Sequence, residues 1–282
     1  MTTKTRLVRL GLMVLGMIAL VVVLVLVQLP MRAAHLPDLV AWPILIAVSL
    51  GAYAAWVRLV ERRRVDELAP SAALPDGAFG LTIGLVLFTV TMTLLALAGA
   101  YRFGGFNSWS PLAVGIADAV GAAVTEELLF RGFLFRVVRD VGGTWTAVAV
   151  SAIVFGALHA FNPGASLLST IAIALEAGVL LALAYAATNR LWLPIGLHAG
   201  WNFAEGTMFG TSVSGHAAMP SLLRGVLQGP AALTGGSFGP EASFVAILVC
   251  LAASAAFAVV VIRRERALGS AASYRFRRST GT

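Results

Sequence analysis

The stretch LGLMVLGMIALVVVLVLVQL, residues 10–29, contains no charged residue and decides the class of fold. About 20 such residues in an α-helix span roughly 30 Å, the thickness of the hydrocarbon core of a bilayer. Lys4, Arg6 and Arg9 come directly before the run. Because the run is longer than the apolar core of a signal peptide, we expect a retained first membrane span.

Similar apolar segments recur along the whole chain of 282 residues. We expect eight of them, at residues 10–29, 39–60, 79–101, 111–140, 144–161, 165–188, 191–210 and 243–262. The chain is 59% hydrophobic and only 12% charged, whereas about 25% of the residues of an ordinary soluble domain are charged. There is no ten-residue alternation typical of a membrane β-barrel. The sequence therefore predicts an all-α, polytopic membrane bundle of about eight transmembrane helices, forming one domain over residues 1–282.

The net charge of +7 has an uneven distribution. With the N-terminus inside and eight spans, 17 of the 20 Lys and Arg residues lie in cytoplasmic segments, and only Arg32, Arg102 and Arg224 lie outside. This asymmetry follows the positive-inside rule, which predicts that both termini are cytoplasmic. The basic residues are then topological signals beside a lipid bilayer, and no nucleic-acid partner is expected. The basic cytoplasmic tail, residues 263–282, is expected to be unstructured.

Ionisable side chains inside membrane spans are costly, and they mark functional sites. Here they are Asp118, Glu126, Glu127, His159, Glu176, His198 and, at a segment end, Glu205. In AVTEELLFRG, residues 123–132, Glu127 and Arg131 stand four residues apart, which favours an ion pair on one helix face. Glu126 is turned about 100° away from Glu127 and is free to face elsewhere.

The other polar residues fall into pairs at the same spacing. Phe155 and His159 lie four apart in FGALH, and His198 and Asn202 lie four apart in HAGWN. A turn at Gly142–Gly143 would form a helical hairpin with Glu126 and His159 at one level. His198 lies at a similar depth in its own span, so three helices are expected to converge on one polar layer.

This set of residues has two possible chemistries. A carboxylate and an imidazole can together hold and deprotonate a water molecule, while a second imidazole and an amide stabilise an oxyanion. Alternatively, Glu126, His159 and His198 can bind a divalent metal ion, zinc in the first instance, that activates the water. Either version hydrolyses a carbonyl compound, most simply a peptide bond. A transporter or proton-coupled channel also uses buried Glu and His, and a non-catalytic membrane scaffold is the third hypothesis.

The motifs carry a family resemblance. EELLFR, FGALH and HAGWN fit EExxxR, FxxxH and HxxxN in this order, and the region of about 110–210 thereby resembles the CPBP family, which includes type II CAAX prenyl endopeptidases and bacteriocin self-immunity proteins. The resemblance implies an intramembrane endopeptidase acting on a peptide or protein substrate at the membrane. It assigns Glu126 as water-activating base or metal ligand, His159 as its partner, and His198 with Asn202 as oxyanion or metal ligands. Glu127, Arg131 and Phe155 would support the site.

The remaining polar residues have simpler interpretations. Cys250 lies in an apolar run and is expected only to pack, and Glu205, His35 and His216 are expected to be solvated. Asp118 and Glu176 are left without a role. The composition is typical of a protein of the bacterial cytoplasmic membrane, and we expect a cavity that opens towards the cytosol.

Overall fold

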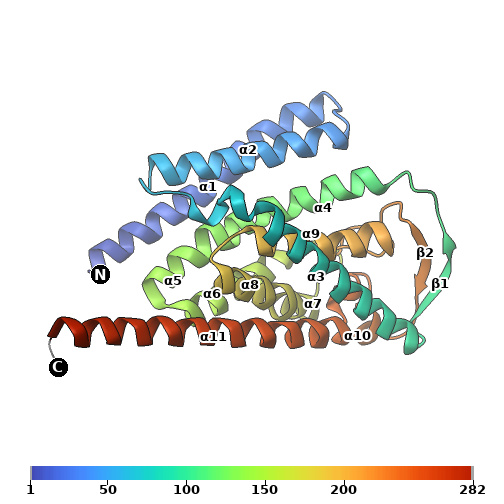
Figure 1. Ribbon diagram of the computed structural model, residues 1–282. Coiled ribbons are helices and arrows are strands. Elements are labelled where there is room, and N and C mark those ends of the chain that lie inside the picture. Colours follow the sequence, from blue (N-terminus) through green and yellow to red (C-terminus); the bar gives the residue numbers. More distant parts are fainter. Residues whose placement is uncertain (1, 281–282) are drawn as a thin grey trace.

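The computed structural model describes the backbone of residues 2–280 and the side chains of residues 2–267 as a bundle of helices with one small sheet (Figure 1). The long helices are α1 (Thr3–Ala33), α2 (Asp38–Leu59), α3 (Pro70–Leu97) and α11 (Phe244–Thr280). The shorter helices are α4 (Leu112–Glu127), α5 (Arg136–Gly142), α6 (Thr144–His159), α7 (Leu167–Ile173), α8 (Val179–Thr188), α9 (Trp192–Asn202) and α10 (Ala231–Thr234). Two 3₁₀ turns are η1 (Asp66–Leu68) and η5 (Pro240–Ala242).

Three π-helical segments continue these helices. η2 (Leu128–Phe135) joins α4 to α5, η3 (Ala174–Gly178) joins α7 to α8, and η4 (Phe203–Met208) extends α9. Each of the eight predicted segments is therefore mainly helical. Among the described residues, five helices are long and apolar enough to cross a membrane, and the apolar helix Thr144–His159 is shorter. The chain is an integral membrane protein.

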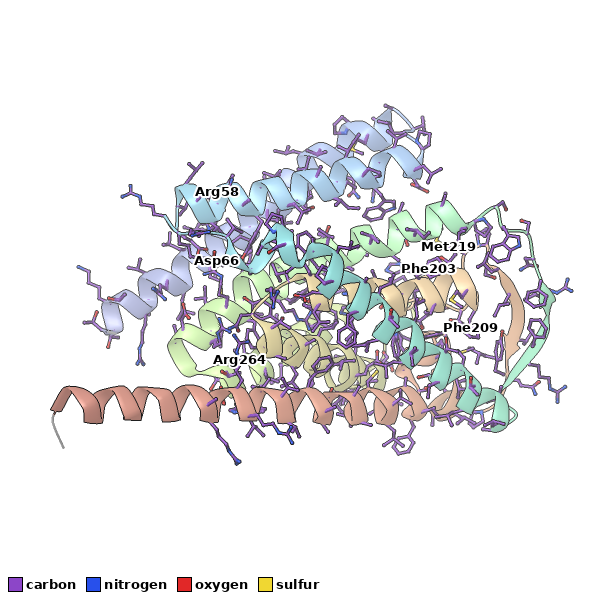
Figure 2. The ribbon with its side chains drawn as sticks, in the orientation of Figure 1. Arg58, Asp66, Phe203, Phe209, Met219 and Arg264 are labelled. Atoms are coloured by element: carbon purple, nitrogen blue, oxygen red, sulfur yellow. The ribbon has the colours of Figure 1, made fainter. Side chains whose placement is uncertain are left out.

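The bundle has two distinct ends. In Figure 1 the α1–α2 hairpin lies along one side and α11 along the opposite side, with α4 to α9 between them. We call the end that holds the start of α1 and the far end of α11 the basic end, because Arg58 and Arg264 also lie there (Figure 2). It is tied together by Arg9, whose Nη1 lies 2.6 Å from Asp140 Oδ2, and by Arg264, which donates to the Ala187 carbonyl at 2.8 Å. The opposite end, with Phe209 and Met219, is the sheet end.

The sheet corrects the prediction that the fold is all-α. β1 (Tyr101–Phe106) pairs antiparallel with β2 (Leu223–Leu227), and a bulge between Phe103 and Gly105 shifts the register. Gly105 has a φ of 126°, which glycine adopts readily. The two strands are more than 100 residues apart in the chain, so local periodicity gives no sign of their pairing.

The prediction of an unstructured tail was also wrong, since α11 continues from the apolar segment to Thr280. Residues 263–268, RRERAL, are all strong helix formers, and no proline interrupts them. The last two residues of the predicted tail lie outside the described part of the chain.

Helices α3 and α9 pack closely through two pairs of glycines. An added Cβ would lie 2.1 Å from the Leu197 carbonyl oxygen at Gly84, and 2.3 Å from the Leu81 carbonyl oxygen at Gly200. Gly80 and Gly196 meet the facing backbone in the same way. Small residues at four-residue spacing let membrane helices approach closely. This packing positions α9, which carries His198 and Asn202.

Gly84→Ala and Gly200→Ala should therefore each destabilise the protein by about 1–3 kcal/mol, the usual cost of overpacking. The measurement is thermal unfolding in detergent. Gly51→Ala in α2 is the matched control, because no atom lies within 4 Å of its added Cβ, and it should be neutral or slightly stabilising. Equal melting temperatures for all three variants would show that the α3–α9 contact is not tight.

A buried ionic cluster closes the basic end. Glu67 is 4% exposed and receives two hydrogen bonds from Arg63, at 2.6 and 2.8 Å, and one from the Tyr53 hydroxyl. Burial by itself raises the pKa of Glu67, but the hydrogen bonds from Arg63 and Tyr53 outweigh it, so the pKa lies below its ordinary value. The carboxylate therefore favours the folded state in its ionised form.

This shift predicts an acid-sensitive contribution to stability. The folded-state pKa of Glu67 is lowered. The ionised carboxylate therefore adds to the free energy of unfolding above the unfolded-state pKa of about 4.3, and this contribution is lost as the pH falls through the folded-state pKa. The melting-temperature advantage of the native chain over Glu67→Gln should be constant above about pH 5 and shrink below about pH 4.3. Asp66→Asn, at a neighbouring side chain that is 79% exposed, should show a much smaller advantage at every pH. A Glu67 advantage that grows on acidification would contradict this account.

Candidate active site

The two adjacent glutamates sit where α4 passes into the π-helical turn η2, and they face different surroundings. Glu127 is fully buried, whereas the Glu126 side chain is 33% exposed. The helical geometry separates them as the sequence predicts. π-helical turns cost stability and are frequent at functional sites, and this one begins at the residue after Glu127.

Glu127 links two other charged or polar groups. Its Oε1 accepts from Arg131 Nη1 at 2.8 Å and from His198 Nδ1 at 3.1 Å. The ion pair expected from the four-residue spacing is therefore present, and the contact with His198 is additional. Arg131 is also fully buried, donates from Nη2 to the Gly178 carbonyl at 3.1 Å, and lies 4.8 Å from the centroid of the Phe155 ring.

The contact with Glu127 decides which nitrogen of His198 is available. The carboxylate can only accept, so Nδ1 carries a hydrogen and Nε2 faces Glu126. His198 Nε2 lies 4.0 Å from Glu126 Oε2, which is too long for a direct hydrogen bond. Among the described residues, Glu126 Oε2 has no hydrogen-bond partner.

His159 is held by its own helix in a similar way. Its Nδ1 donates to the Phe155 carbonyl at 2.7 Å, and its ring lies 4.5 Å from the Phe155 ring at an interplanar angle of 39°. Because the carbonyl can only accept, Nε2 of His159 is left with its lone pair. Phe155 also meets His198 edge-on at 6.2 Å, so one buried ring positions both imidazoles.

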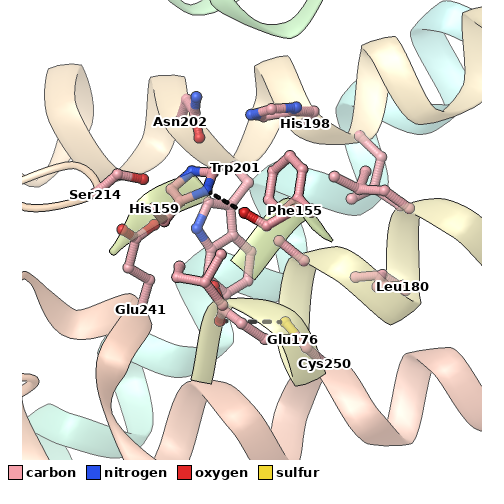
Figure 3. A pocket seen from close by; sticks show the side chains of 14 residues that line it. Phe155, His159, Glu176, Leu180, His198, Trp201, Asn202, Ser214, Glu241 and Cys250 are labelled. Carbon is pink, nitrogen blue, oxygen red and sulfur yellow. Dashed lines mark hydrogen bonds between the residues drawn. The ribbon is translucent and has the colours of Figure 1, made fainter. Parts of the chain in front are cut away.

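One large cavity connects the predicted site residues. It has a volume of about 950 Å³, and Glu126, His159, His198 and Asn202 all line it. A small pocket of about 30 Å³ adjoins it behind His159 and Asn202, with room for about one water molecule. Figure 3 shows His198 and Asn202 on the same side of their helix, next to His159. The structure thus brings together the four residues that the sequence analysis assigned to catalysis.

The cavity opens at the sheet end, whereas the sequence analysis expected an opening towards the cytosol; in the predicted topology the sheet end is the opposite end. Its lining reaches the exposed residues Arg32, Ser110 and His216. Towards the basic end the bundle is filled by Phe133, Phe135 and other side chains with no exposed surface. The direction of the opening depends on how α1 and α2 pack against α4, which sequence patterns do not show.

Two buried acids were missed or misplaced by the sequence analysis. Glu205 was expected to be solvated, but it is fully buried and accepts from Trp201 Nε1 at 3.1 Å. Its carboxyl group lies close to that of Glu241, and two buried carboxyl groups side by side favour a proton on one of them. Glu241 was not singled out, because it lies in a connection; it is 3% exposed and points toward His159 (Figure 3).

The two residues without an assigned role lie on opposite sides of the site. Glu176 is 1% exposed, lines the small pocket, and lies 3.9 Å from the sulfur of Cys250. Asp118 lines the large cavity nearer the sheet end. Cys250 is buried in the apolar core, as predicted.

The predicted metal ligands do not form a compact donor set. In the described part of the chain, no group of three or more His, Cys, Asp or Glu side chains is arranged to hold a metal ion. Glu126 and His198 are separated by 4.0 Å, and the available nitrogen of His159 belongs to a ring fixed by the Phe155 carbonyl. Both features are compatible with a water molecule or with an ion held between these side chains.

Comparison with known proteins gives one match. A family model described as Type II CAAX prenyl endopeptidase Rce1-like matches residues 108–204. This segment contains Glu126, His159, His198 and Asn202. No curated protein and no solved structure matches the chain significantly.

The geometry predicts opposite outcomes for the two adjacent glutamates. Glu127→Gln leaves the buried charge of Arg131 uncompensated, and it should lower the free energy of unfolding by about 3–5 kcal/mol. Glu126→Gln, in which no hydrogen bond is lost, should leave stability within about 0.5 kcal/mol of the native chain. Denaturant unfolding in detergent compares the two, and a fully stable Glu127→Gln variant would refute the role of Glu127 as counter-ion.

Proposed function

Because residues 108–204 form a domain of the Rce1-like type II CAAX prenyl endopeptidase family, a family of proteases, we propose that the chain hydrolyses a peptide bond within the membrane by means of a water molecule held between Glu126 and His159. The observation that carries the proposal is the Glu126 side chain, which is 33% exposed, lines the same cavity as His159, His198 and Asn202, and has an Oε2 without a hydrogen-bond partner among the described residues. Glu126 is the one glutamate of the adjacent pair that no cation neutralises directly.

The charges of the site support Glu126 as the base. Glu126, Glu127, Arg131 and His198 together are neutral when one proton is shared between His198 and Glu126. Neutrality is favoured because an uncompensated buried charge is costly. With that proton on His198, Glu126 is ionised and able to accept a proton, and His198 Nε2 becomes a donor toward the cavity.

The proposed reaction begins with attack of the water on the peptide carbonyl and ends with release of the amine. The Glu126 carboxylate removes one proton from the water while His159 Nε2 accepts a hydrogen bond from its other hydrogen. The water oxygen bonds to the carbonyl carbon, and the carbonyl π electrons move to its oxygen. When that oxyanion collapses, the C–N bond breaks and the proton held by Glu126 passes to the leaving amine. The products are a carboxylic acid and an amine.

The developing oxyanion is stabilised by donors from α9. His198, protonated at Nε2, and the Asn202 side-chain amide lie one helical turn apart and line the same cavity. Fixed donors in a site that excludes water typically contribute about 3–4 kcal/mol each to the transition state. Glu127 holds the His198 ring in place, so its part in the reaction is to position that donor.

A metal-bound water is the alternative chemistry at the same residues, with zinc as the first candidate. Metal content of the purified protein, measured together with activity before and after chelation, separates the two versions. Full activity in metal-free protein supports the glutamate mechanism. Stoichiometric zinc whose removal abolishes cleavage and whose return restores it would replace that mechanism.

The proposal also includes the number of membrane spans and the side on which the termini lie. We place eight spans in the cytoplasmic membrane of a bacterium with both termini in the cytosol, because the Lys and Arg residues gather at the basic end. The substrate is a peptide or protein in contact with the membrane. Transport and scaffold functions have no specific observation in their favour.

Glu126→Gln should lower kcat for a peptide substrate by at least about 10³-fold, because an amide cannot remove the proton. Asp140→Asn, the same chemical change in α5 at the basic end, should retain full activity. Cleavage of a fluorogenic peptide mixture in detergent measures both. Undiminished turnover by Glu126→Gln would overturn the assignment, whereas solute flux in proteoliposomes that depends on Glu126 would favour a transporter.

A further inference from the structure

The position of the cavity relative to the charged residues indicates from which side the substrate enters. Apart from Arg131, which is buried beside the site, the basic end carries the segments that hold 16 of the 20 Lys and Arg residues. The sheet end carries Arg32, Arg102 and Arg224. Cationic segments are retained on the cytoplasmic side of a membrane, so the sheet end is the extracytoplasmic one.

The site is closed toward the basic end. Directly after the two glutamates, η2 places Arg131 and Phe133 in the core with no exposed surface. Tyr53, from the last turns of α2, is also fully buried, and its hydroxyl oxygen, which donates its hydrogen to Glu67, lies 3.1 Å from the Gly132 carbonyl oxygen. These side chains, with the ionic cluster around Glu67, separate the cavity from the basic end.

The same cavity is open toward the sheet end. From Glu126 it follows the face of α4 past Asp118 and Val114 to Ser110. Its rim is formed by residues from three separate elements: Arg32 at the end of α1, Ser110 before α4, and His216 in the loop before β2, all of them exposed. The wall is mainly apolar, with Trp42 and Met219 on either side of the opening.

We propose that the active site takes its substrate from the extracytoplasmic side and that the substrate is a peptide segment with apolar side chains, presented by a secreted or membrane-anchored protein. The proposal rests on the function proposed above. It follows from the closed basic end, the open sheet end and the charge difference between them. A substrate confined to the cytosol would meet the basic end, where buried side chains of the described residues lie between the surface and Glu126.

Cysteine labelling tests the side of access without any need for activity. The native chain has one cysteine, Cys250, which is 1% exposed and serves as the blank. Ala217→Cys places a thiol at the opening of the cavity, and Leu59→Cys places one at the basic end, where the side chain is 75% exposed. A membrane-impermeant maleimide applied to spheroplasts of a bacterial host should label Ala217→Cys at once, and Leu59→Cys only after lysis. The reverse pattern would overturn the proposal.

Cleavage supplies the second measurement. A fluorogenic mixture of unprenylated peptides added outside sealed spheroplasts should be hydrolysed, and Glu126→Gln should abolish this hydrolysis. Sealed inverted vesicles should cleave the peptide mixture only after detergent opens them. A maleimide attached to Ala217→Cys should slow cleavage, whereas a maleimide attached to Leu59→Cys should not. Cleavage by sealed inverted vesicles alone would overturn the side of entry and leave the protease assignment intact. If no preparation shows Glu126-dependent cleavage, even in detergent, the proposed function is overturned and the substrate class with it. The labelling experiment would still decide the side of access.

Discussion

The buried guanidinium of Arg131 is the constraint on which the site depends. A charge with no exposed surface in an apolar bundle must be compensated, and Glu127 compensates it at 2.8 Å. The same carboxylate binds His198 of α9, while Arg131 donates to the Gly178 carbonyl in η3 and lies against Phe155 of α6. One ion pair thus fixes the relative positions of four helical segments, of which α4, α6 and α9 carry the candidate catalytic groups. Glu126, one residue earlier, is left with a free carboxylate oxygen.

The three π-helical segments occur where this network needs altered helix geometry. η2 follows Glu127, η3 supplies the carbonyl that Arg131 contacts, and η4 follows Asn202. A π turn loosens the regular hydrogen-bond ladder and frees a backbone carbonyl. The Gly132 carbonyl in η2 accepts from Arg136 Nε at 2.8 Å, and its oxygen lies 3.1 Å from the Tyr53 hydroxyl oxygen. The stability lost in these turns is offset by bonds between helices, including the glycine-mediated contact of α3 with α9.

The sequence predicts those parts of the fold that depend on local spacing. The eight helical segments, the turn at Gly143 and the Glu127–Arg131 pair all follow from apolar runs, glycine conformation and helical periodicity. Contacts between distant segments could not be predicted in this way. The pairing of β1 with β2, the burial of Glu205 beside Glu241, and the opening of the cavity depend on how a long connection folds over the bundle. That connection lacks the apolar periodicity from which burial is inferred, so its buried acid Glu241 was missed.

The central claim is that Glu126 activates water and does not itself attack the peptide. A single-turnover cleavage with enzyme in excess, in water enriched in the heavy oxygen isotope, tests it directly. Mass spectrometry of the product and of the peptide containing Glu126 locates the label. The account predicts one heavy oxygen atom in the new carboxyl group of the product and none in Glu126. An unlabelled product together with labelled Glu126 would show a covalent intermediate and contradict the claim.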